Sequence, residues 1–153
     1  MTLTVSFKKG GYTAQKNFEI TVVRRFGTNL AAAADVKSAS SEMSTRPAKN
    51  MLDGDFSTTY ATAAKSDASY VILDLGEKKR IGGALLWAES NLAAMRLYAS
   101  DNGLDFTLLC EENAVTGRNL LELKKTECRF VKAELEPQDA AKCIEIAELM
   151  LFD

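Results

Sequence analysis

Short apolar runs broken by turn residues restrict the fold of this sequence more than any other feature. Within the runs, apolar and polar residues alternate: Val71, Leu73 and Leu75 fall on one side and Asp74 on the other. A period of two residues indicates β-strands with one buried face. Long helical segments between the runs, which a parallel sheet requires, are absent. We therefore predict an antiparallel β-sandwich with strands at residues 36–40, 70–75, 83–87, 95–100, 107–110, 119–123, 129–135 and 144–152.

One segment, STRPAKNMLDG, favours a helix, and only for a single turn. Pro47 suits the first turn of a helix, and either Ser44 or Thr45 can cap it. Gly54 lies just past its expected end.

The first residues predict a separate β-hairpin. Residues 2–7 and 17–23 both alternate, and the stretch KKGGYTAQK separates them. A lone two-stranded hairpin is marginal in water, so its apolar side needs a cover. The pattern resembles the last two strands of immunoglobulin-like modules that precede accessory domains in bacterial surface enzymes. We assign residues 1–28 to a hairpin and linker, the end of a preceding domain, and residues 29–153 to the sandwich; the alternative is that the hairpin belongs to the sandwich.

Composition excludes several classes of function. Histidine is absent, so the usual general base near neutral pH and the commonest zinc ligand are both missing. The net charge of −2 gives no general attraction to phosphate backbones, which argues against nucleic acid as a partner. No apolar run approaches the length of a membrane helix, and the start MTLTVSFKKGG lacks the apolar stretch of a secretory signal. We predict that the chain is not an enzyme and does not insert into membranes.

The three cysteines do not form a metal motif. Cys110, Cys128 and Cys143 are far apart in sequence, and each lies in or beside a predicted strand. We interpret them as core or sheet residues, and a disulfide between Cys110 and Cys128 is the alternative.

A series of fragments in fixed order resembles the discoidin-like, coagulation factor 5/8 C-type domains, which include the family 32 carbohydrate-binding modules. The fragments are VKSASSE, PAKNMLDGDFSTTY, VILDLGEKKRIGG, RLYASDNGLDFTLL, CRFVKAEL and IEIAELMLF. The resemblance runs from Asn29 to the end of the sequence. It implies a jelly-roll β-sandwich of the galactose-binding-domain-like type.

The resemblance also implies a structural calcium ion beside the loop NMLDGDFSTT. Calcium takes six to eight hard oxygen ligands from carboxylates and carbonyls. Glu148 stands in the apolar run IAELMLF, where an unpaired carboxylate is costly to bury, and a cation would explain it. The alternative is that Asp53 and Gly54 form a simple turn and Glu148 faces solvent. The predicted metal ligands are Asn50, Asp53, Asp55, Thr58 and Glu148.

In sugar-binding members of the family, loops at one end of the sandwich carry an aromatic platform and hydrogen-bonding side chains. Here the matching loops hold few aromatic residues, and Ala88 and Glu89 replace the arginine-containing signature of galactose-binding relatives. Trp87 is the candidate platform, although a core position is an equal alternative. The predicted ligand-binding residues are Trp87, Glu89, Asn91, Glu42, Tyr60 and Lys65.

These features together predict a non-catalytic carbohydrate-binding module. We expect it to act as an accessory to a larger secreted, periplasmic or cell-surface protein, a bacterial glycoside hydrolase, with a glycan or polysaccharide and the other domains of the parent chain as partners. The alternative is a structural, protein-interaction or adhesion module of the same fold without a sugar site.

Overall fold

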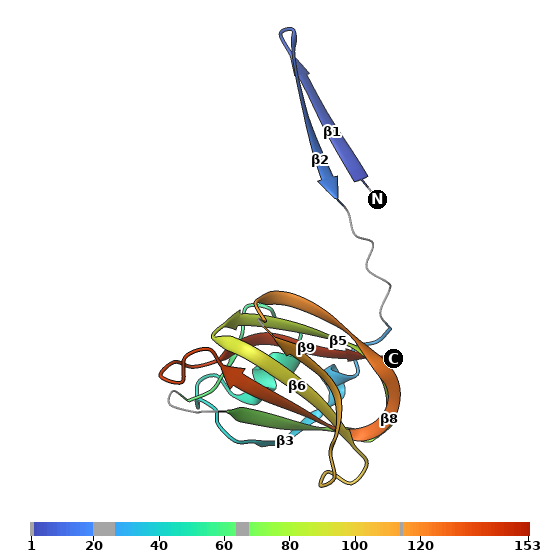
Figure 1. Cartoon of the computed structure of the whole chain (residues 1–153), viewed down its shortest axis with the longest axis vertical. Coiled ribbons are helices and arrows are strands. Elements are labelled where there is room, and N and C mark those ends of the chain that lie inside the picture. The colour runs from blue at the N-terminus through green and yellow to red at the C-terminus, as the bar shows by residue number, and fades with distance from the viewer. Residues whose placement is uncertain (1, 20–26, 64–67, 114) are drawn as a thin grey trace.

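The computed structural model describes residues 2–19, 27–63, 68–113 and 115–153 (Figure 1). Nearly all regular structure is β. The strands are β1 (Thr2–Lys9), β2 (Tyr12–Glu19), β3 (Asp35–Ala39), β4 (Tyr60–Ala61), β5 (Ser69–Ser90), β6 (Leu92–Ser100), β7 (Thr107–Asn113), β8 (Gly117–Pro137) and β9 (Glu145–Phe152). Two short 3-10 helices, η1 (Ala31–Ala33) and η2 (Ala48–Leu52), complete the set. No helix in the described ranges is long and apolar enough to cross a membrane.

Two long bent strands build both layers of the sandwich. β5 and β8 pair with each other along most of their length, with a break in register between Asp74 and Lys79. Gly76 adopts a φ of 80° there, which few other residues tolerate. Before the bend, β5 also pairs with β3, and the C-terminal half of β8 pairs with β6, which pairs with β7; after the bend, β5 pairs with β9, which pairs with β4. All these pairings are antiparallel, so the predicted fold class is confirmed.

The core lies between the two layers. Val71, Leu73 and Leu75 are all buried, as their alternation predicts. They pack in one cluster with buried residues of the other layer, such as Leu86 and Leu149. The predicted strands correspond to observed ones, but runs 70–75 and 83–87 are both parts of β5, and runs 119–123 and 129–135 are both parts of β8. The two residues of β4 were not predicted.

The N-terminal hairpin forms its own two-stranded sheet. Its turn is the pair Gly10-Gly11, with φ of 55° and 81°, and Lys9 pairs with Tyr12. Positive φ at both positions is what a tight two-residue hairpin turn requires. The predicted start of the second strand at residue 17 is therefore wrong, because β2 begins directly after the glycines; residues 20–23 of that prediction lie outside the described residues. The domain boundary at residue 28 stays a prediction.

The predicted helical turn is present as η2, with Pro47 just before it, but its cap differs from the prediction. Neither Ser44 nor Thr45 caps it; instead the carboxylate of Glu42 accepts a hydrogen bond of 2.9 Å from the backbone N–H of Ala48. A carboxylate at this position satisfies a backbone donor that the helix itself cannot.

The three cysteines are free. Cys128 is buried and Cys110 packs against the core, as their interpretation as sheet residues predicts. The alternative Cys110–Cys128 disulfide is not formed, because Cys110 lies opposite Leu97 of β6 whereas Cys128 lies opposite Lys79 of β5.

Candidate functional sites

A tight loop between η2 and β4 lies over strand β9. It turns at Gly54, whose φ is 75°. The carboxylate of Asp53 accepts a hydrogen bond from the N–H of Asp55, and that of Asp55 accepts bonds from both the N–H and the hydroxyl of Ser57. The bonds from Ser57 lower the pKa of Asp55 below its usual value. This local network leaves the Asp55 carbonyl, rather than its carboxylate, facing the centre of the loop.

Oxygen atoms converge on the hydroxyl of Thr58. Its Oγ1 lies 2.8 Å from a carboxylate oxygen of Asp53, 3.1 Å from the carbonyl of Asp55 and 3.4 Å from the carbonyl of Asn50. A hydroxyl carries one proton and donates it to one acceptor. The carbonyl of Asp55 also accepts a hydrogen bond of 3.0 Å from the N–H of Thr58. The hydroxyl can donate to only one of the three oxygens, and a cation among them would use the lone pairs that remain.

Glu148 reaches this loop from β9 below it. The residue is 0% exposed, its Oε2 accepts a hydrogen bond of 3.2 Å from the N–H of Gly54, and its Oε1 has no hydrogen-bond partner. Burial, with a further contribution from the charge of Asp53, raises the pKa of Glu148 to about 7. The alternative in which Glu148 faces solvent is wrong. Leaving a buried charge uncompensated costs several kilocalories per mole, on the order of 3–5 kcal/mol.

The residues around Thr58 fit a calcium ion. Two carboxylates, Asp53 and Glu148, two carbonyls and one hydroxyl supply the mixture of hard oxygens that calcium prefers. No cluster of three or more histidine, cysteine, aspartate or glutamate side chains occurs in the described part of the chain. The donors around Thr58 are all oxygens, which suit calcium better than zinc.

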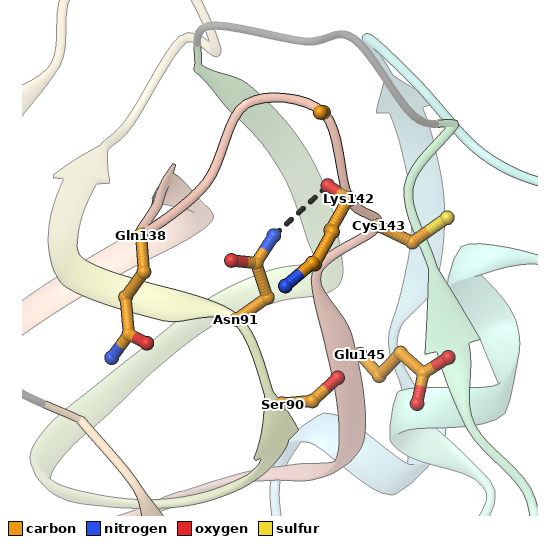
Figure 2. A pocket seen from close by; sticks show the side chains of 7 residues that line it. Ser90, Asn91, Gln138, Lys142, Cys143 and Glu145 are labelled. Carbon is orange, nitrogen blue, oxygen red and sulfur yellow. Dashed lines mark hydrogen bonds between the residues drawn. The ribbon is translucent and has the colours of Figure 1, made fainter.

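A separate open hollow of about 520 Å³ lies at the end of the sandwich where β5 turns into β6 and where the loop 138–144 leads into β9 (Figure 2). Its lining is mostly polar: Ser90, Asn91, Gln138, Ala141, Lys142, Cys143 and Glu145. Ser90 and Glu145 are cross-strand partners at its base. Glu145 is held by an ion pair with Arg46. The ammonium of Lys142 lies 3.4 Å from a carboxylate oxygen of Asp139, but the Lys142 side chain is 73% exposed, so further N–H donors face solvent near the Ser90 hydroxyl.

Asn91 shapes this hollow. Its φ of 59° is left-handed, a conformation that asparagine tolerates better than most residues. Its amide donates to the carbonyls of Asp139 and Lys142 at 3.0 and 2.9 Å, and its Oδ1 accepts from the N–H of Asp139 at 2.9 Å. The side chain of Asn91 therefore holds the loop 138–144 in place through these hydrogen bonds (Figure 2).

The other predicted ligand-binding residues do not gather around the hollow. Glu89 is exposed beside it, Glu42 caps η2, and Lys65 lies outside the described residues. Tyr60 is 0% exposed and donates its hydroxyl to the carbonyl of Ser41, and burial raises its pKa. The prediction for Tyr60 is corrected: it is a core residue.

Trp87 points to the outer face of its layer, away from the hollow. Its neighbours across the sheet are Arg118 of β8 and Glu148 of β9. The ring of Phe56, from the oxygen-rich loop, lies 5.1 Å from that of Trp87, and the guanidinium of Arg118 lies 4.1 Å from the Trp87 ring centroid. Sequence reasoning missed Arg118 because its place beside Trp87 depends on the register of β5 with β8, and it missed Phe56 because the path of its loop over the sheet is not visible in any local pattern.

The fold and the oxygen-rich loop define a discoidin-like β-sandwich. The family model of the F5/8 type C domain matches residues 36–149, and the chain belongs to this family. No curated protein matches the sequence significantly.

Several solved structures share the fold. Chitosan-binding module 1 of a chitosanase/glucanase from Paenibacillus sp. IK-5 is 17% identical, with a TM-score of 0.76 over 83% of this chain and 100% of that one. CpGH89CBM32-5 from Clostridium perfringens, in complex with GalNAc-β-1,3-galactose, is 21% identical, with a TM-score of 0.72 over 82% and 100%. A Ruminococcus gnavus GH29 fucosidase in complex with fucose is 21% identical, with a TM-score of 0.73 over 82% of this chain and 26% of that one. At these identities the likeness establishes the fold alone.

Proposed function

We propose that this chain is a non-catalytic carbohydrate-binding module that serves a larger secreted or surface-located glycoside hydrolase. Family membership supports the class, and the relatives named above include a chitosan-binding module and a protein in complex with a disaccharide. The observation that carries the proposal is the polar hollow at one end of the sandwich. Loops at the end of a rigid β scaffold are where such folds place binding groups.

The hollow offers hydrogen-bonding groups suited to sugar hydroxyls. Lys142 can donate hydrogen bonds, and Ser90 can both donate and accept. The amide nitrogen of Gln138 already donates to the Leu92 carbonyl at 3.3 Å, but its amide oxygen can accept a hydrogen bond from a sugar. No aromatic side chain lines it among the described residues. Stacking would therefore contribute little, and we expect weak binding that becomes useful when several modules or an enzyme act on one polymer.

A calcium ion in the oxygen-rich loop would be structural in this proposal. Asp53, Thr58 and Glu148 would bind it through side chains, and Asn50 and Asp55 through carbonyls. The ion would supply positive charge that offsets the buried Glu148 carboxylate and fixes the loop against β9.

The test is a glycan screen of the full chain in calcium, followed by calorimetric titration of the positives. We expect saturable binding that the double substitution Lys142→Ala and Gln138→Ala weakens, with Lys124→Ala on β8 as the control for loss of one exposed lysine. Folded protein that binds no glycan would overturn the proposal. It would favour the second candidate, a protein-interaction module, for which the lack of an aromatic platform in the hollow is the supporting observation.

A further inference from the structure

Phe56, Trp87 and Arg118 form a second surface, which we call the aromatic–arginine surface. It lies on the outer face of the layer that contains β9, and none of its residues lines the hollow at the strand ends. Phe56 is 46% exposed, and Leu120, one step along β8 on the same face, is 43% exposed. Large apolar side chains are therefore open to solvent beside a cation.

The three groups of this surface are packed as a triangle. The ring centroids of Phe56 and Trp87 are 5.1 Å apart, and the Arg118 guanidinium carbon lies 4.1 Å from the Trp87 centroid and 5.9 Å from that of Phe56. If Phe56 and Arg118 lay on opposite faces of the indole, their separation would approach the sum of the other two distances. They do not enclose the indole between them, so the surface is an open cluster rather than a closed stack.

Arg118 differs from the other arginines that the structure describes. Those residues all pair with carboxylates: Arg46 with Glu145, Arg80 with Asp153, Arg96 with Glu111, and Arg129 with Asp74. The guanidinium of Arg118 makes no hydrogen bond or ion pair with any described residue, and its contacts are with the two aromatic rings. None of its five N–H donors makes a hydrogen bond to a described residue.

A guanidinium that lies over an aromatic ring is prepared to bind an oxyanion. Its planar fork matches a carboxylate with two parallel hydrogen bonds, and the stacking limits the rotamer entropy lost on binding. The neighbouring ring of Phe56 offers an apolar face of the kind on which the C–H face of a sugar packs.

We propose that the aromatic–arginine surface binds a carboxylate-bearing sugar residue, a uronic acid unit of an acidic polysaccharide. Arg118 pairs with the carboxylate, and Phe56 with the exposed edge of Trp87 packs against the sugar ring. The residues of this surface do not line the hollow at the strand ends, and an open surface suits a segment of polymer rather than a small enclosed ligand. The surface is separate from the hollow, so it is tested independently of the proposed function.

The probe is trigalacturonate, and its fully methyl-esterified form is the matched neutral sugar. Each is titrated calorimetrically into the full chain with calcium present, and Trp87 fluorescence is followed in parallel. We expect the acid to bind at least about tenfold more tightly than the ester, the difference that a charge-assisted hydrogen bond produces. Equal affinity for the two forms, or no binding of the acid, would overturn the proposal. So would binding of a sulfated trisaccharide in preference to the uronate, because the surface would then recognise sulfate.

Variants locate the binding. Arg118→Gln should weaken the acid at least about tenfold, whereas Arg118→Lys, which keeps the charge but not the planar fork, should fall in between. Lys124→Gln removes one positive charge elsewhere on β8 and should leave affinity unchanged. Phe56→Leu keeps an apolar side chain without the aromatic face and should weaken both probes. Equal losses in Arg118→Gln and Lys124→Gln would show a general charge effect and refute the site.

Discussion

Replacing Glu148 by glutamine is expected to stabilise the calcium-free protein near neutral pH, although it removes a proposed calcium ligand. The carboxylate is 0% exposed, only one of its oxygens is hydrogen-bonded, and Asp53 adds a second negative charge nearby. Burial favours the neutral acid, so the pKa of Glu148 rises from 4.5 to about 7 on folding. Glutamine has nearly the same shape and carries no charge at any pH.

The magnitude follows from the two pKa values. Below pH 4.5 Glu148 is protonated in both the folded and the unfolded chain and contributes no pH dependence. Between pH 4.5 and 7 the unfolded chain releases the proton and the folded chain keeps it. The free energy of unfolding therefore falls as pH rises, by about 1.4 kcal/mol per pH unit and about 3 kcal/mol across the window. Calcium bound to the ionised carboxylate would reverse this loss.

The assay is urea unfolding of wild type and Glu148→Gln in a chelating buffer at a series of pH values, repeated with calcium. Taking the difference between the two proteins cancels the contribution of every other titrating group. We expect the difference to favour the variant increasingly up to pH 7 without calcium, and to favour wild type when calcium is present at about 1,000 times its Kd, where binding adds about 4.1 kcal/mol. Parallel pH profiles, with no response to calcium in wild type, would refute both the burial argument and the site.

Three further outcomes are expected. Calcium should change the fluorescence emission of Trp87, because Phe56 on the proposed calcium loop lies 5.1 Å from the indole. Phe56→Ala should lose this emission change but keep a calcium-dependent Tm. A calcium-induced shift in the wild-type Tm without any emission change would contradict this coupling between loop and indole. Leu97→Ala, at a position 0% exposed, should lower the free energy of unfolding by about 2–5 kcal/mol in urea, whereas Leu120→Ala, at a position 43% exposed, should cost far less. Both Asn91→Gly and Asn91→Ala should lower the free energy of unfolding, because both remove the side-chain hydrogen bonds of Asn91. Asn91→Ala should lower it by about 1 kcal/mol more, since alanine is strained at a φ of 59° and glycine is not. Equal free energies of unfolding for the two variants would show that the loop relaxes.

The sequence predicts the sandwich well because its evidence is local. Alternation places Val71, Leu73 and Leu75 in the core without knowledge of their neighbours. The bend in β5 is harder to foresee. Gly76 looks like the end of a strand, but the chain continues hydrogen bonding to β8 after a change in register. Two predicted strands are thus one, and the layer boundary runs through it.

The two kinds of site differ in how far the sequence reveals them. Glu148 was predictable because a carboxylate in an apolar strand needs compensation, and its unpartnered oxygen agrees with that reasoning. The core position of Tyr60 was not predictable, because its hydroxyl donates to the carbonyl of Ser41, a partner that the sequence does not reveal. The row Arg118, Trp87 and Glu148 arises from the registers of β5 with β8 and β9, which depend on long-range packing.

The chain enters and leaves the sandwich at one edge, and this affects how the module can be carried. The N–H of Leu30 donates to the carbonyl of Leu151 at 2.8 Å, and Asn29 accepts from the N–H of the same residue at 3.1 Å. Glu145, near the other end of β9, lines the polar hollow, roughly 20 Å from Leu151 at the usual rise of an extended strand. A tether that joined the sandwich through residue 28 would therefore hold it at the end opposite the hollow.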